Sequence, residues 1–114
     1  MSDVLNPVEA EAAIRRLGNR LSEFVPVVSQ AERVMVTAKT ELERAEANAM
    51  LHAQGTVAER EAQVVLAVQA ERDTYDVAYL AFRDAERKMR TLRENLSAAQ
   101  SISASVRAMY GAER

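Results

Sequence analysis

The single histidine, His52, is the side chain best suited to metal binding or to general acid–base catalysis at neutral pH. Glu59 and Glu61 follow it, but the chain has no second histidine and no cysteine. A metal site needs several ligands that cluster in space. His52 also lies just before Gly55, at the expected end of a helix, where an imidazole interacts with the helix dipole. We therefore assign His52 a structural role and predict no metal site.

The carboxylates and serines do not form a recognisable catalytic set either. Glu41, Glu43 and Asp76 each have a basic residue three or four positions away, a spacing that is typical of a solvated helix face. The serines have no histidine to activate them, and no glycine-rich phosphate loop is present. The sequence therefore predicts a non-enzymatic protein with no cofactor and no small-molecule substrate.

Basic residues gather toward the two ends of the chain. Residues 25–81 carry 5 basic and 9 acidic side chains, and the rest of the chain carries 10 and 8. Clustered cations are what a phosphate backbone requires. Asp84, Glu86 and Glu94 interleave the cluster, so a helix surface crossed by salt bridges is the alternative. The possible nucleic-acid contacts are Arg15, Arg16, Arg20, Arg83, Arg87, Lys88, Arg90 and Arg93.

Three capping patterns predict where helices begin. Asn6-Pro7-Val8-Glu9 places an N-cap, a first-turn proline and a glutamate that answers the cap. Ser29-Gln30-Ala31-Glu32 and Thr56-Val57-Ala58-Glu59 are capping boxes. Gly55 suits the left-handed conformation that closes a helix, so we expect the chain to reverse there.

An apolar repeat with alternating three- and four-residue spacing runs on both sides of Gly55, and we call its positions the seam. Such a repeat predicts a supercoiled helix pair. Glu71 occupies a seam position, where a polar residue commonly fixes the register. The first seam comprises Ala10, Ile14, Leu17, Leu21, Phe24, Val28, Ala31, Met35, Ala38, Leu42, Ala45, Ala49 and His52. The second comprises Val64, Val68, Glu71, Tyr75, Ala78, Phe82, Ala85, Met89, Leu92, Leu96, Ala99, Ser103, Val106 and Tyr110.

The predicted fold is all-α, a long antiparallel helical hairpin that forms one domain over residues 1–114. Its arms are residues 7–54, read as two nearly collinear helices kinked near Pro26, and residues 56–110. Folding about Gly55 pairs positions whose numbers sum to about 109 or 110. A three-helix bundle, with residues 7–24 folded back, is the alternative architecture.

A two-helix hairpin buries one stripe of each helix, and apolar residues remain outside the two stripes. An exposed apolar strip usually indicates an interaction surface. We expect a homodimer that forms a four-helix bundle, and a further protein partner. The predicted strip consists of Val34, Val65, Leu66, Tyr79, Leu80, Ile102 and Met109.

The composition agrees with a small helical protein that gains burial by association. The chain has 21 alanines, 3 glycines and no tryptophan. Alanine favours helix but buries little area. The N-terminal residues lack the pattern of a signal peptide, and no apolar run approaches the roughly 18 residues of a membrane span. We expect no membrane association and a cytoplasmic location.

The residues Gly55-Thr56-Val57-Ala58-Glu59-Arg60-Glu61-Ala62, with the heptads that end in Leu96-Ser97-Ala98-Ala99-Gln100-Ser101, resemble the short coiled-coil accessory proteins of tailed bacteriophages. The resemblance covers residues 55–101 and carries no catalytic or binding residues. It implies a phage or prophage origin, a bacterial host and an accessory role near recombination or replication genes.

Three functions follow as hypotheses. The first is a protein-binding adaptor, which would serve a phage recombination or replication complex. The second is nucleic-acid binding through the arginine cluster. The third is a phage-encoded inhibitor of a host defence protein, in which the acidic residues around Gly55 occupy a basic groove.

Overall fold

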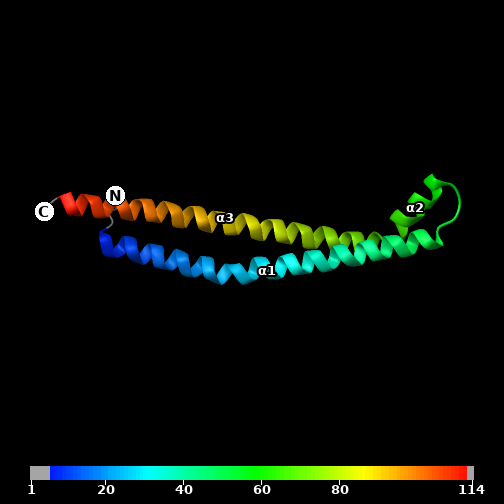
Figure 1. Cartoon of the computed structure of the whole chain (residues 1–114), viewed down its shortest axis with the longest axis horizontal. Helices are drawn as coiled ribbons and strands as arrows, with labels where there is room; N and C mark the ends of the chain where they lie inside the picture. Colours follow the sequence, from blue (N-terminus) through cyan, green and yellow to red (C-terminus); the bar gives the residue numbers. More distant parts are fainter. Residues whose placement is uncertain (1–5, 113–114) are drawn as a thin grey trace. The chain divides into compact units, whose positions relative to one another are not determined.

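The computed structural model describes residues 6–112, and within that range the chain is helical with no strand (Figure 1). Helix α1 is Pro7–His52, α2 is Val57–Ala67 and α3 is Gln69–Ala112. The predicted all-α class is therefore confirmed.

The first predicted capping pattern is formed at the start of α1. The Glu9 backbone N–H donates to Asn6 Oδ1 at 2.9 Å, and the Asn6 N–H donates to Glu9 Oε2 at 3.3 Å. These bonds satisfy two donors that a helix N-terminus otherwise leaves unpaired.

Helix α1 continues through Pro26, which contradicts the prediction of a helix start at Ser29. Pro26 cannot donate a backbone hydrogen bond to the Ser22 carbonyl. Ser22, Val25 and Pro26 are all exposed, so water can satisfy that carbonyl. The second capping box is not used because the seam continues through this point. The alternative three-helix bundle is also wrong, since residues 7–24 belong to the same helix as the rest of the arm.

The reversal at Gly55 and the third capping box are confirmed. Gly55 has a φ of 110°, a conformation that side chains rarely adopt. The Thr56 hydroxyl accepts from the Glu59 N–H at 3.2 Å at the start of α2. The Gln63 side chain of α2 holds the loop backbone at Gln54. Its amide oxygen accepts from the Gln54 N–H at 3.1 Å, and its amide nitrogen donates to the Gln54 carbonyl at 2.8 Å.

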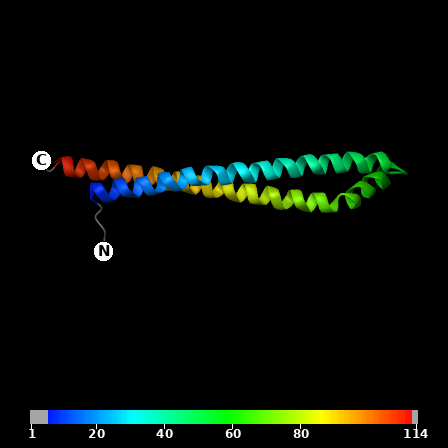
Figure 2. The same cartoon turned by 90° about the horizontal axis from the view of Figure 1, so that it is seen from below.

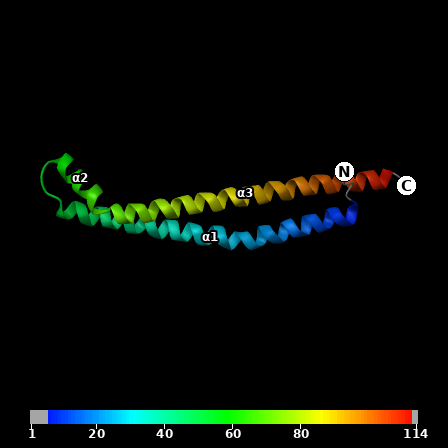
Figure 3. The same cartoon turned by 180° about the vertical axis from the view of Figure 1, so that it is seen from behind.

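The predicted second arm, residues 56–110, is divided at Val68, which the repeat did not indicate. Val68 has φ −109° and ψ 18°, outside the helical region. Its N–H still donates to the Val64 carbonyl at 3.1 Å, and its carbonyl accepts from the Arg72 N–H at 2.9 Å. The backbone bonds therefore continue while the direction changes, and Figure 3 shows α2 at an angle to the start of α3.

The chain divides into two compact units. Unit 1 comprises Met1–Val27 and Glu86–Arg114, and unit 2 comprises Val28–Ala85. In each unit a part of α1 lies beside a part of α3, in views from two directions (Figures 1 and 2). The buried residues of unit 1 are Ala10, Met89, Leu92, Ser103 and Val106, and those of unit 2 are Ala38, Leu42, Val64, Val68, Ala78 and Ala85.

All these buried residues are predicted seam positions, and the other seam residues are half-buried with two exceptions. His52 and Tyr110, the last members of the two seams, are exposed. The heptad repeat thus identifies the core of each unit.

Two glycines give a matched test of the turn. We expect Gly55→Ala to destabilise the protein by about 1–2 kcal/mol, since a side chain is strained at this φ and its Cβ would meet Glu59 Oε2 at 2.6 Å. We expect Gly18→Ala to stabilise it by up to about 1 kcal/mol, because Gly18 lies inside α1 and a Cβ there meets nothing within 4 Å. Urea unfolding followed by circular dichroism measures both. Equal changes in the free energy of unfolding from the two substitutions would show that the positive φ of Gly55 does not constrain the turn.

Candidate interaction surface

His52, the first candidate for chemistry, is exposed in the last turn of α1. Its Nδ1 lies 2.8 Å from the Asn48 carbonyl oxygen, which can only accept, so Nδ1–H is the donor. Within residues 6–112, no three His, Cys, Asp or Glu side chains gather closely enough to hold a metal ion. In the same range, no helix has the length and apolar character needed to cross a membrane.

The positions next to the seam form two flanks that differ in charge. Each residue directly before a seam residue that ends a four-residue step, such as Arg20 before Leu21, belongs to the groove flank. Its 13 positions include 3 charged residues. The residues directly after a seam residue that begins a four-residue step, such as Gly18 after Leu17, form the opposite flank. We call it the charged flank, because 8 of its 13 residues are charged. The groove flank consists of Ala13, Arg20, Val27, Val34, Glu41 and Asn48 on α1, and of Ala67, Thr74, Ala81, Lys88, Asn95, Ile102 and Met109 on α2 and α3. The charged flank consists of Glu11, Gly18, Val25, Glu32, Lys39 and Glu46, and of Val65, Arg72, Tyr79, Glu86, Arg93, Gln100 and Arg107.

Helix geometry explains why each set keeps to one side. Residues at the same heptad position follow the seam, and the residues before and after a seam position point to opposite sides of it. In an antiparallel pair, the same heptad position of both helices falls on the same side. The charge difference is therefore a difference between two faces of each unit.

Open grooves lie along the groove flank, and the linings of those given below include no charged-flank residue. In unit 1, a groove of about 440 Å³ is lined by Arg20, Glu23, Phe24, Lys88, Thr91, Leu92 and Asn95. In unit 2, grooves of about 190, 260 and 510 Å³ all include Glu41 in their lining. Small seam residues such as Ala38 and Ala45 leave this space.

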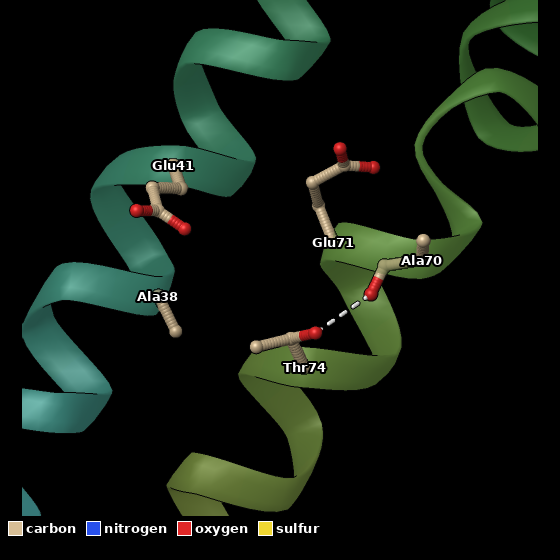
Figure 4. A pocket seen from close by; sticks show the side chains of 5 residues that line it. All are labelled: Ala38, Glu41, Ala70, Glu71 and Thr74. Carbon is tan, nitrogen blue, oxygen red and sulfur yellow. Dashed lines mark hydrogen bonds between the residues drawn. The ribbon is translucent and has the colours of Figure 1, made fainter.

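Glu41 of α1 and Glu71 of α3 line opposite sides of the groove of about 190 Å³ (Figure 4). The Thr74 hydroxyl donates to the Ala70 carbonyl at 3.0 Å, so it is engaged with its own helix. Two carboxylates on an alanine-lined floor make the groove acidic. Glu71 is half-buried, as expected for a seam position, and lines this groove as well as the one next to Asn48.

Part of the charge on the charged flank is neutralised by an ion pair within unit 2. Arg72 of α3 pairs with Glu46 of α1 at 3.4 Å, with side chains 50% and 39% exposed. An exposed pair of this kind contributes within about 1 kcal/mol. The Tyr75 and Tyr79 rings stack at 6.1 Å, and Arg83 lies over Tyr79 at 5.9 Å and donates to its hydroxyl at 3.1 Å.

The eight basic residues of the predicted cluster are all exposed, but they do not converge on one face. Arg20 and Lys88 line the same groove in unit 1. Arg93 lies on the charged flank and Arg87 two residues before the seam residue Met89, so both point elsewhere. Arg83 belongs to unit 2. The remaining members, Arg15, Arg16 and Arg90, lie in unit 1 outside its groove.

Six of the seven residues of the predicted apolar strip are exposed, and Tyr79 is half-buried. They do not form one strip. Val34, Ile102 and Met109 lie on the groove flank, whereas Val65 and Tyr79 lie on the charged flank. Leu66 and Leu80 point away from the seam, since Leu80 is two residues from both Ala78 and Phe82.

The prediction also missed nine exposed apolar side chains, three of which lie near the reversal at Gly55. Leu51 is 83% exposed and Val57 62%. Both side chains are exposed because the helix pair ends here. Val57 lies seven residues before the seam residue Val64, but α1 has already ended at His52 and cannot cover it. The remaining ones are Val8, Val25, Val27, Val36, Met50, Val77 and Tyr110.

A seam leucine and an outward leucine provide a matched test of the seam assignment. We expect Leu42→Ala to cost about 2–5 kcal/mol because Leu42 is 4% exposed in the seam. Leu80→Ala should change the free energy of unfolding by no more than about 0.5 kcal/mol, because Leu80 is 67% exposed. Thermal or urea unfolding measures both. A large loss from Leu80→Ala would show that this side chain is already covered in the isolated protein.

Comparison with protein-family models, curated proteins and solved structures gives no significant match for this chain.

Proposed function

We propose that the chain is a non-enzymatic coiled-coil adaptor that binds another protein and acts as a homodimer. The observation that carries this proposal is the distribution of large apolar side chains. Among the described residues, fifteen large apolar side chains are exposed, whereas six are buried: Leu42, Val64, Val68, Met89, Leu92 and Val106. A small helix pair that buries so few large side chains usually gains burial by association. In a four-helix bundle, a second helix pair covers part of it.

The outer face of unit 2 is the surface we assign to the protein partner. Leu66 and Leu80 occupy the same heptad position and point away from both flanks, and Leu51 and Val57 lie near the reversal. A dimer that forms through a flank leaves these side chains exposed. The resemblance to phage accessory proteins motivates a role in a recombination or replication module of a phage or prophage, in the cytoplasm of its host.

Two measurements test the adaptor. Sedimentation equilibrium at micromolar concentration should give twice the chain mass of 12.6 kDa. Affinity capture from a bacterial host should recover a stoichiometric partner with the native chain and lose most of it with the double variant Leu66→Gln, Leu80→Gln. Asp73→Asn, at the same heptad position between them, is the matched control and should retain the partner. Monomeric mass, or capture of nothing at all, would contradict the proposal.

The identity of the captured protein separates two roles. A component of a DNA-processing complex supports the adaptor. A host defence enzyme with a basic groove would instead support the inhibitor, for which unit 2 offers its net negative charge: 10 acidic and 6 basic residues between positions 28 and 85.

Nucleic-acid binding is the second candidate function, because the groove in unit 1 combines Arg20 and Lys88 with the ring of Phe24. Two cations beside an aromatic ring are the elements of a single-strand binding groove. Glu23 in the same groove weakens this electrostatic attraction.

Fluorescence anisotropy with labelled single- and double-stranded DNA, at two salt concentrations, tests this second function. If it holds, micromolar binding should weaken steeply with salt. Arg20→Glu should then reduce the affinity at least tenfold, as should the triple variant Arg87→Glu, Arg90→Glu, Arg93→Glu if the whole cluster takes part. Arg33→Glu in unit 2 is the control and should have little effect. No binding at low salt would remove nucleic acid as a partner.

A further inference from the structure

Helix α2 carries the seam spacing beyond the bend at Val68. Counting back from Val68 in steps of four, three and four residues gives Val64, Glu61 and Val57. Val64 is buried, whereas Glu61 and Val57 are exposed, because α2 leaves the line of α3 at the bend (Figure 1). A helix continuous from Val57 through Val68 into α3 would place all three on the seam side. The residues of unit 2 are therefore compatible with a straight arm as well as with the bent one.

The bend leaves backbone hydrogen bonds unmade. Val68 keeps its own two bonds, one to Val64 and one from Arg72. Neither helix includes the bond from the Gln69 N–H to the carbonyl of residue 65, or the bond from the Glu71 N–H to the carbonyl of residue 67. A continuous helix would form both, since each N–H bonds to the carbonyl four residues earlier. A straight arm therefore gains bonds that the bent arm lacks.

Arg60 supplies a second interaction that the bent form leaves unsatisfied. The residue is half-buried, and its Nε is buried with no hydrogen-bond partner among the described residues. A buried donor without a partner loses its hydration without compensation. In a continuous helix, residue 60 would directly precede the seam position of Glu61 and so fall on the groove flank. Arg20 and Glu41 are exposed at that position of α1, so straightening would return the Arg60 side chain to water.

The hydrogen bonds between Gln63 and Gln54 act against straightening. The Gln63 side chain bonds to both the N–H and the carbonyl of Gln54. In a straight hairpin, paired numbers sum to about 110, in agreement with the groove that Ala38 shares with Ala70 and Thr74. Residue 63 would then lie opposite residue 47, inside α1 and away from the loop. Both bonds to Gln54 would have to break, so they hold the bent form.

We propose that the junction of α2 and α3 is a hinge. Helix α2 moves about Val68 between the bent form, held by the Gln63–Gln54 bonds, and a straight form in which it continues α3. In the straight form, Val57 and Glu61 extend the seam. The loop 53–56 serves both forms, since antiparallel helices are commonly joined by a few residues. A carboxylate at seam position 61 weakens the straight form, which explains why the bent form is the one observed.

The movement changes the apolar surface at the reversal. In the bent form, Leu51 and Val57 are 83% and 62% exposed. Straightening turns Val57 toward the seam and reduces this surface. A partner that binds the exposed surface would therefore select the bent form and shift the equilibrium toward it. This last consequence rests on the proposed adaptor function, whereas the hinge itself is a property of the isolated chain.

Amide hydrogen exchange measured by NMR tests the hinge in the isolated chain, with rates corrected for local sequence. In the native chain, we expect the Gln69 and Glu71 amides to exchange about tenfold faster than the bonded amides of Val68 and Arg72. Gln63→Ala removes the bonds that hold the bent form and should slow the exchange of Gln69 and Glu71 about fivefold or more. Gln54→Ala is the matched control and should leave these rates unchanged, because only the backbone of Gln54 takes part.

A second variant favours the straight form without touching the bonds to Gln54. Glu61→Leu places an apolar side chain at the position that enters the seam on straightening, whereas residue 61 is exposed in the bent form. It should slow the exchange of Gln69 and Glu71 about fivefold or more. Ala62→Leu adds a leucine at the next residue, which is exposed and outside the seam, and should leave both rates unchanged.

The outcomes decide the hinge independently of the adaptor. Slower exchange of Gln69 and Glu71 in both variants, with unchanged controls, supports it. Unchanged exchange at these two amides overturns it. Faster exchange throughout residues 57–68 in Gln63→Ala also overturns it, because α2 would then unfold rather than straighten. The measurement involves no partner, so failure of the hinge leaves the adaptor standing, and failed capture of a partner leaves the hinge standing.

Discussion

The structure depends on one constraint: a helix that packs against a single neighbour can bury one stripe of its surface. Here that stripe is the seam, which supplies the buried residues of both units and fixes which sides of each helix become flanks. Much of the seam is alanine, which buries little area and allows close approach. Leu42, Met89 and Leu92 are among the few large side chains that are buried. The limited burial explains why a chain with abundant apolar residues still exposes fifteen large ones among those described, and why association is the natural way to cover them.

The sequence predicts the seam and the reversal well, because both rest on local chemistry. A heptad repeat needs no knowledge of the rest of the fold, and the φ of Gly55 and the Thr56 cap follow from residue type. The same local logic fails at Ser29. A capping box there competes with a helix whose seam residues already pack on both sides, and the packing prevails over the capping signal. The change of direction at Val68 had no indication in residue type, since valine at a seam position fits a continuous helix equally well.

The candidate surface was harder to predict for a geometric reason. Exposure can be inferred from the repeat, and six of the seven apolar residues chosen are exposed. Which of them share a face depends on the angle of each residue from the seam. Sorting by heptad position separates Val34 from Leu80 and Arg20 from Arg93, and gives each flank its own charge. The grooves themselves required coordinates, because they arise where alanines face each other at particular levels of the pair.

Helix α2 has a consequence for the order in which the protein opens. It has 11 residues, a length at which an isolated helix is marginal in water. Val64 is its buried residue, Val68 is buried at its C-cap, and the hydrogen bonds between Gln63 and Gln54 hold the loop before it. With so few attachments, its amide hydrogens should exchange with solvent well before those of α1 and α3. A partner that engages this end of unit 2 would then contact a segment in equilibrium between folded and unwound forms. Its association rate would depend on how often that segment is in place.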